Sequence, residues 1–132
     1  MYYRFGTGAN AEFIEDSPLS RAGGCNATVA LLRRAPSITA FFACNDEVAI
    51  GAMNAAREMG RDIPGDLSLV GFDDIDLAQE ISPTLTTVHV DKVLMGVLAV
   101  RHLRDRAENP GRPALTTTLG TTLIIRESVR PI

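Results

Sequence analysis

Two short, nearly unbroken apolar runs with an amphipathic segment between them constrain the fold of this chain most strongly. The runs cover residues 38–44 and 67–72, and both are rich in Phe, Val, Ile or Leu. Such runs are typical of strands buried on both faces of a parallel sheet. The segment between them repeats apolar side chains at the spacing of a helix of roughly four turns. These are Val48, Ala49, Ala52, Met53, Ala56 and Met59. The pattern predicts a β-α-β unit.

Polar residues follow each of the two predicted strands. Asn45 and Asp46 come after the first strand, where either side chain is suited to cap the helix, and Asp73 and Asp74 come directly after the second. In open α/β sheets, ligands bind at the carboxyl ends of the strands. The hypothesis of a ligand site therefore starts at this edge, and capping or turn formation by the same residues is the structural alternative.

The segments before this unit predict one further helix. Residues 1–11 carry two glycines and no periodicity, which favours an irregular lead-in, and Glu12–Glu15 has the composition of a short strand. A helix is predicted from near Ser20 to Arg34, where a proline soon enforces its end. Its core side is expected to carry Ala27, Ala30 and Leu31.

The segments after the unit predict a short helix, an extended segment, a long helix and a final strand region. Residues 75–80 favour the short helix, and residues 82–88 favour the extended segment because a proline restricts the backbone there. Helical spacing returns over Asp91–Ala107, and an Asn-Pro-Gly sequence ends it. Residues 115–126, rich in Thr, Leu and Ile, predict one or two strands with a bend at Gly120.

Composition and charge narrow the class of protein. With 132 residues, 45% of them hydrophobic and 22% charged, the chain is expected to form one globular domain at most. A net charge of −3 gives no electrostatic reason for direct contact with nucleic acid. Cys25 and Cys44 lack metal-ligand spacing, which favours small buried thiols in a reducing compartment. No apolar run approaches the roughly 20 residues that cross a membrane, and the start lacks a signal-peptide pattern. A cytoplasmic location is therefore expected.

Four segments carry a more specific signal when they are taken in this order and spacing. They are residues 39–52 with an Asn-Asp-Glu motif, 63–75 with a Gly-Phe-Asp-Asp motif, 83–88 and 125–128. Together they resemble the C-terminal part of the effector-binding domain of the lac repressor/galactose repressor (LacI/GalR) family of bacterial transcription regulators. The resemblance implies an α/β fold like that of type I periplasmic sugar-binding proteins. In that fold, two subdomains, each a parallel sheet flanked by helices, hold a small ligand in the cleft between them.

The resemblance also divides the chain. Residues 1–132 are expected to form part of one effector-binding domain, with 1–11 as the lead-in and 12–88 as the C-terminal subdomain. Residues 89–110 are expected to be a crossover and a helix that normally packs on the N-terminal subdomain, so its apolar stripe should be exposed here. Residues 111–132 are expected to return as strands. The helix-turn-helix segment and most of the N-terminal subdomain are expected to lie upstream of Met1.

The resemblance places three effector-binding residues on this sequence, Asn45, Asp73 and Leu19. A carboxylate can accept hydrogen bonds from two vicinal hydroxyl groups, and an amide offers both a donor and an acceptor, which suits a polyol. Leu19 stands near a position where many relatives carry an aromatic side chain that stacks on the effector. Asp46 is expected to act as a cap instead, and Asp74 to be exposed.

The resemblance further predicts a two-fold dimer. The surfaces expected to form it are the helix that follows the Asn-Asp motif and the segment that follows Gly-Phe-Asp-Asp. The residues predicted in this interface are Ala49, Ala52, Met53, Ala56, Leu77 and Ile81. A basic stretch at residues 101–106 is interleaved with apolar positions, which favours a solvated helix face over a nucleic-acid surface.

The leading functional hypothesis is the ligand-sensing part of a transcription regulator. Its effector is expected to be a sugar or nucleoside-like molecule that alters the geometry of a homodimer, with DNA contacted only by a helix-turn-helix segment outside this chain. A substrate-binding component for sugar uptake is the alternative, because it shares the fold. A receiver-like phosphoacceptor or enzyme using Asp73 and Asp74 with Mg²⁺ is disfavoured, since Lys92 opens a helix and the two histidines lie away from any nucleophile signal. No catalytic residue, metal or cofactor is expected.

Overall fold

The structure is a computed structural model, and it describes residues 13–131. Four helices and four strands alternate along these residues. In chain order they are α1 (Arg21–Arg34), β1 (Ala40–Phe42), α2 (Asp46–Glu58), β2 (Ser68–Asp73), α3 (Leu77–Glu80), β3 (Thr86–His89), α4 (Lys92–Glu108) and β4 (Thr122–Ile124). The predicted lead-in at residues 1–11 lies outside the described residues.

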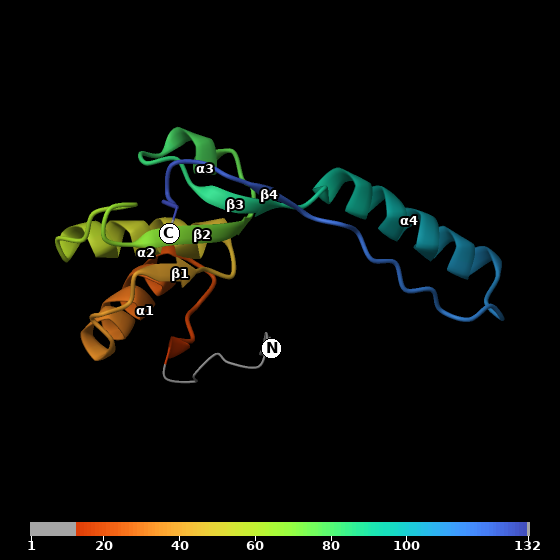
Figure 1. Cartoon of the computed structure of the whole chain (residues 1–132). Coiled ribbons are helices and arrows are strands. Elements are labelled where there is room, and N and C mark those ends of the chain that lie inside the picture. The colour runs from red at the N-terminus through yellow and green to blue at the C-terminus, as the bar shows by residue number, and fades with distance from the viewer. Residues whose placement is uncertain (1–12, 132) are drawn as a thin grey trace.

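The strands form one sheet in the order β1-β2-β3-β4. The first three are parallel, and β4 runs antiparallel to β3. The predicted β-α-β unit is therefore confirmed as β1-α2-β2, and the α/β class with a mainly parallel sheet is confirmed with it. Figure 1 shows α1 and α2 beside the strands, whereas α4 extends away from them.

Two glycines allow α1 and α2 to touch through their backbones. A Cβ atom added at Gly24 would lie 2.1 Å from the Val48 carbonyl oxygen, and one added at Gly51 would lie 2.0 Å from the Arg21 carbonyl oxygen. Contacts this short exclude every larger side chain at both positions unless the helices move apart. The core side of α1 follows from this crossing and buries Thr28, Leu31 and Leu32. The predicted Ala30 is exposed instead.

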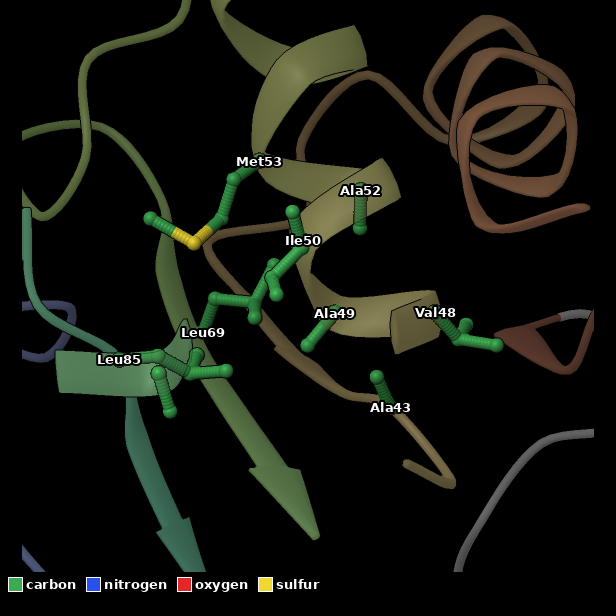
Figure 2. Close-up of a cluster of buried hydrophobic side chains, with 9 residues drawn as sticks. Ala43, Val48, Ala49, Ile50, Ala52, Met53, Leu69 and Leu85 are labelled. Carbon is green, nitrogen blue, oxygen red and sulfur yellow. The ribbon is translucent and has the colours of Figure 1, made fainter. Parts of the chain in front are cut away.

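The hydrophobic core lies between α2 and the strands. Figure 2 shows Ala49, Ile50 and Met53 of α2 beside Leu69 of β2 and Leu85 next to β3. Ala49, Leu69 and Leu85 are fully buried, and Met53 is 2% exposed. Burial of these side chains is the main term that stabilises the unit.

This core overturns part of the predicted dimer interface. Ala49, Ala52, Met53 and Ala56 are all at most 4% exposed, because α2 packs against α1 on one side and the sheet on the other. These four side chains offer no surface to a second copy, and their assignment to a dimer was wrong. Leu77 and Ile81 are half-buried and retain exposed surface.

The N-terminal strand prediction was also wrong for the residues that are described. Phe13 and Ile14 are about half exposed and belong to no strand. The end of α1 binds this stretch instead, since the Arg34 guanidinium donates to the Glu15 carboxylate at 2.8 Å and to the Ile14 carbonyl at 3.3 Å.

The long helix α4 has no buried residue. Its apolar side chains are exposed, as expected for a stripe without a partner; they include Val93, Leu94, Met95, Val97, Val100 and Leu103. Among the described helices, none combines the length and hydropathy needed to cross a membrane. Cys44 is exposed and Cys25 is half-buried, so the expectation of two buried thiols was wrong.

After α4 the chain returns to the sheet as one strand, β4, and the segment after β4 is hydrogen-bonded to β2 and β3 through Ser128. Ser128 is fully buried. Its hydroxyl donates to the Leu69 carbonyl at 2.6 Å and accepts from the Thr86 amide at 2.8 Å. The Ser128 carbonyl also accepts from the Leu69 amide at 2.8 Å. The segment after β4 therefore joins the start of β2 to the start of β3.

Candidate functional site

The carboxyl ends of β1 and β2 meet at one edge of the sheet, because the two strands are parallel neighbours. Asn45 follows β1, and Asp73 is the last residue of β2. The structure thus brings both predicted effector-binding residues to the same edge. Whether they contact an effector stays a prediction.

Asn45 is the N-cap of α2. Its Oδ1 accepts a hydrogen bond from the Val48 amide at 2.8 Å, with the extended backbone typical of a cap. Its Nδ2 group donates to no other residue within 13–131, although the side chain is only half-buried. Capping uses the acceptor of the amide and leaves its donor free, so the structural role and the ligand role are compatible.

Asp46 is fully buried and is not the cap. Its Oδ1 accepts from the Thr87 hydroxyl at 2.5 Å, and its Oδ2 accepts from the Ile75 amide at 2.9 Å. The capping role expected for this carboxylate was wrong, because the side chain points into the domain and bonds residues 29 and 41 positions away. Sequence reasoning had no local signal for either partner.

The turn after β2 has an unusual backbone. Asp73 has φ of 110° and Asp74 has φ of 54°, both in the region that side chains other than glycine rarely adopt. Conformations of this kind cost roughly 1–3 kcal/mol per residue and persist only where surrounding contacts impose them. They occur at ligand-binding and catalytic sites more often than elsewhere, which makes this turn a candidate on physical grounds.

The Asp73 carboxylate is half-buried and accepts no hydrogen bond from any residue that the structure describes. Burial raises the pKa of Asp73, the charge of Asp46 raises it further, and the charge of Lys92 opposes both. Lys92 donates its Nζ hydrogen bond to the Asp73 carbonyl oxygen. The edge thus presents a carboxylate whose acceptor capacity is unused.

Unlike Asp73, Asp74 has side-chain partners, and the expectation that it would be exposed was wrong. Its carboxylate, 12% exposed, accepts from Arg126 Nη2 at 2.7 Å and contacts His89 Nδ1 at 2.9 Å. Burial alone would raise the pKa of Asp74, but the hydrogen bonds and charges of Arg126 and His89 outweigh it and hold that pKa below its ordinary value. The ion pair between Asp74 and Arg126 therefore connects the turn after β2 to the segment that follows β4.

Leu19 lies just before Ser20, whose hydroxyl caps α1 by accepting from the Gly23 amide at 3.1 Å. The side chain is 71% exposed. The start of α1 is held beside the start of α2 by an exposed ion pair between Arg21 Nε and Glu47 Oε2 at 2.6 Å. Leu19 is therefore placed at the end of the helix pair that adjoins Asn45, as an apolar side chain open to a partner.

Within the described part of the chain, no three His, Cys, Asp or Glu side chains gather in a way that could hold a metal ion. A shallow hollow of about 190 Å³ lies on the opposite side of α2 from its contact with α1. It is lined by Ile50, Met53, Asn54, Arg57, Ile81 and Ser82. Arg57 closes one side of it by donating to the Ser82 carbonyl at 2.6 Å.

Comparison with known proteins adds a family to this geometry. A family model described as a periplasmic binding protein-like domain matches residues 7–129. The ribose operon repressor of Haemophilus influenzae is 39% identical over 120 residues, which cover 91% of this chain and 36% of that protein. The chain belongs to the LacI family of periplasmic binding protein-like domains. The resemblance inferred from the four sequence segments is confirmed.

Two further comparisons describe the extent of the match of this LacI-family chain. The HTH-type transcriptional regulator GalR of Escherichia coli is 36% identical over 124 residues, covering 94% of this chain and 36% of the regulator. A solved complex of the transcriptional regulator CelR with cellobiose superposes with a TM-score of 0.87 at 32% identity, covering 91% of this chain and 37% of that one. The LacI-family chain thus spans a little over a third of the length of these relatives.

Proposed function

We propose that this chain is the ligand-sensing part of a sugar-responsive transcription regulator. One observation carries the proposal: an unused carboxylate acceptor at Asp73 and an unused amide donor at Asn45 share the carboxyl edge of the sheet. The relatives support it, because they are named as transcriptional regulators and one of the solved ones holds cellobiose. A regulator of this kind binds its effector and performs no chemistry on it.

The two groups suit complementary parts of a sugar. The Asp73 carboxylate can accept hydrogen bonds from two adjacent hydroxyl groups, and Asn45 Nδ2 can donate to a hydroxyl or ring oxygen. Leu19 offers an apolar surface for the C–H face of the ring. We infer that the second wall of the site belongs to the part of the relatives that this chain does not span, since the chain covers only 36% of the ribose operon repressor.

Asp73→Asn is expected to weaken sugar binding by about 10- to 100-fold, because hydrogen bonds to a charged acceptor contribute about 1.5–3 kcal/mol. Calorimetric titration with D-ribose and with cellobiose measures the effect. Asp76→Asn is the matched control, since Asp76 is an exposed carboxylate three residues away whose side chain makes no capping hydrogen bond at the start of α3. Equal affinities of the Asp73 variant and the unmodified chain for both sugars would remove Asp73 from the site.

Regulation also needs a change in assembly, and we propose a homodimer through the hollow beside α2. Ile81, Asn54 and Arg57 supply surface there. Met53 lines the hollow but is only 2% exposed, and the three alanine positions predicted earlier do not line it. Leu77, whose carbonyl accepts a hydrogen bond from the Ile81 amide, stays part of the proposal. Contact with DNA is proposed to occur through a helix-turn-helix segment outside this chain, in the cytoplasm.

Ile81→Glu should weaken self-association by at least about tenfold, because it buries a charge in an apolar contact without a partner. Sedimentation equilibrium of the chain over a range of concentrations gives the dimer dissociation constant. Val100→Glu on α4 introduces the same charge on another exposed apolar side chain, 66% exposed. If the α4 variant changes the dissociation constant and the Ile81 variant does not, the dimer forms through α4 instead.

Catalysis is disfavoured by the surroundings of both histidines. His89 Nδ1 is bound to the Asp74 carboxylate, and His102 Nε2 lies 2.9 Å from the exposed Thr117 hydroxyl. Among the described residues, neither histidine has both a nucleophile and an orienting carboxylate: His89 has only the carboxylate, and His102 has only the hydroxyl. We therefore propose a binding protein, and the regulatory relatives favour it over a component of sugar uptake.

A further inference from the structure

We infer that the buried Asp46 carboxylate and the Thr87 hydroxyl act as positioning groups that hold the Asp73–Asp74 turn in the shape that presents the Asp73 carboxylate to a sugar. The inference rests on the proposed function and adds to it residues that do not touch the ligand. Asp46 begins α2, directly after Asn45, so the same helix start would set both proposed ligand contacts.

Three bonds converge on this turn from separate elements. Asp46 Oδ2 accepts from the Ile75 amide at 2.9 Å, and Asp46 Oδ1 accepts from the Thr87 hydroxyl at 2.5 Å. The same hydroxyl accepts a longer hydrogen bond from the Asp74 amide at 3.4 Å. Together they tie α2 and β3 to the backbone immediately after Asp73, where φ is positive at two successive residues.

The strand beneath the carboxylate is shaped to admit it. A Cβ atom at Gly71 would lie 2.2 Å from Asp46 Oδ1, so only glycine leaves room for the carboxylate over β2. Asp46 and Thr87 are both fully buried, and their polar atoms are paired. Burial of a carboxylate is energetically unfavourable unless it is hydrogen-bonded. The Asp46 carboxylate accepts its hydrogen bonds from Thr87 and from the turn that follows Asp73, and it does not cap its own helix.

Within the described chain the Ile75 amide donates only to Asp46, whereas the Ile75 carbonyl accepts from the Ala78 amide at 2.9 Å and the Ile75 side chain packs against the core. The Asp74 side chain is held by Arg126 and His89, and the Asp73 carbonyl by Lys92, but both of these contacts lie before the Ile75 amide. Loss of the Thr87 hydroxyl would leave Asp46 Oδ1 unpaired and the Asp74 amide without its acceptor. In a chain that lacks this hydroxyl, we expect the turn to open locally while β2 stays paired with its neighbouring strands.

Thr87→Val removes the hydroxyl at nearly constant volume, and Thr87→Ser restores it. In the 132-residue chain, hydrogen exchange of the Asp74 and Ile75 amides should become at least about tenfold faster in Thr87→Val relative to the Val70 amide of β2, and return in Thr87→Ser. Asp46→Asn is the second variant, because it keeps an acceptor for Thr87 but places an amide donor or a weaker acceptor opposite the Ile75 amide. Unchanged relative exchange in both variants would overturn the inference.

The affinity for a sugar distinguishes a positioning role of these hydrogen bonds from a purely structural role. With D-ribose and cellobiose as probes, Thr87→Val should lose about tenfold in affinity under conditions where urea unfolding shows the chain to be folded, and Thr87→Ser should recover it. A variant that is less stable but binds both sugars as before would mean that the bonds are only structural, and the inference would fail. Failure of the proposed function is distinguishable, because Asp73→Asn would then leave affinity unchanged while the turn amides still respond to Thr87→Val.

Discussion

Arg126→Met should lower the free energy of unfolding by about 1.5–3 kcal/mol at neutral pH, which is the usual contribution of a hydrogen bond to a charged group in a partly buried ion pair. The Arg126 and Asp74 side chains are 13% and 12% exposed, and their charged atoms are 2.7 Å apart. Arg126 Nη1 also donates to the Leu85 carbonyl at 2.8 Å. Methionine keeps the alkyl stem, so the loss reports the charge and its bonds.

The effect of this substitution should depend on pH in one direction. Because the pKa of Asp74 is held below its ordinary value, the stability from its ionised form is present above the unfolded pKa of about 3.9 and is lost as the pH falls through the lower folded value. Urea unfolding of the unmodified chain and Arg126→Met should therefore differ most at neutral pH and converge in acid.

Arg104→Met supplies the comparison for the ion pair. Arg104 and Glu108 are 2.9 Å apart on α4, but their side chains are 78% and 60% exposed. Removal of an exposed pair costs about 0–1 kcal/mol. A loss at Arg126 no larger than the loss at Arg104 would show that the Asp74 contact contributes nothing beyond a surface pair.

Gly51→Ala should destabilise the chain by about 3 kcal/mol, although alanine is the better helix former by about 1 kcal/mol. The new Cβ atom would lie 2.0 Å from the Arg21 carbonyl oxygen, and neither backbone can yield without separating α1 from α2. Packing therefore outweighs propensity at this position.

Gly96→Ala tests the same substitution without the contact. Gly96 also lies inside a helix, but no atom within 4 Å would meet its Cβ. Propensity alone then acts, and urea unfolding and helical circular dichroism should show a gain of about 0.5–1 kcal/mol or none, but no loss. Equal effects at the two glycines would contradict the close crossing of α1 and α2.

The elements set by local patterns could be predicted from the sequence. The stripe between the two apolar runs, with Asn45 before it, was sufficient for β1-α2-β2, because helix periodicity and caps depend on near neighbours. The same stripe misled the dimer prediction. A wide band of small apolar residues can face one partner or two, and here α1 and the sheet take both sides.

The roles of the site carboxylates could not be predicted in the same way. Asp46 and Asp74 both have surroundings that differ from those expected, because their partners Thr87 and Arg126 are 41 and 52 residues distant. A pair of adjacent acidic residues after a strand shows that one edge is polar. Which carboxylate is buried and which stays available depends on the positive φ angles of Asp73 and Asp74 and on contacts with the segment after β4, and neither has a local sequence signature.

The chain leaves the sheet after β3, forms α4, and returns to the sheet in β4, the antiparallel neighbour of β3. His89, the last residue of β3, is the register partner of Thr122, the first residue of β4. Antiparallel strands that face each other in this way are ordinarily joined by a two-residue hairpin turn. Residues 90–121 are therefore an insertion into a β-hairpin. Their length and sequence can therefore differ between proteins while the β3-β4 ladder stays the same, and α4 is tied to the sheet both through this pair and through the Lys92 hydrogen bond to the Asp73 carbonyl oxygen.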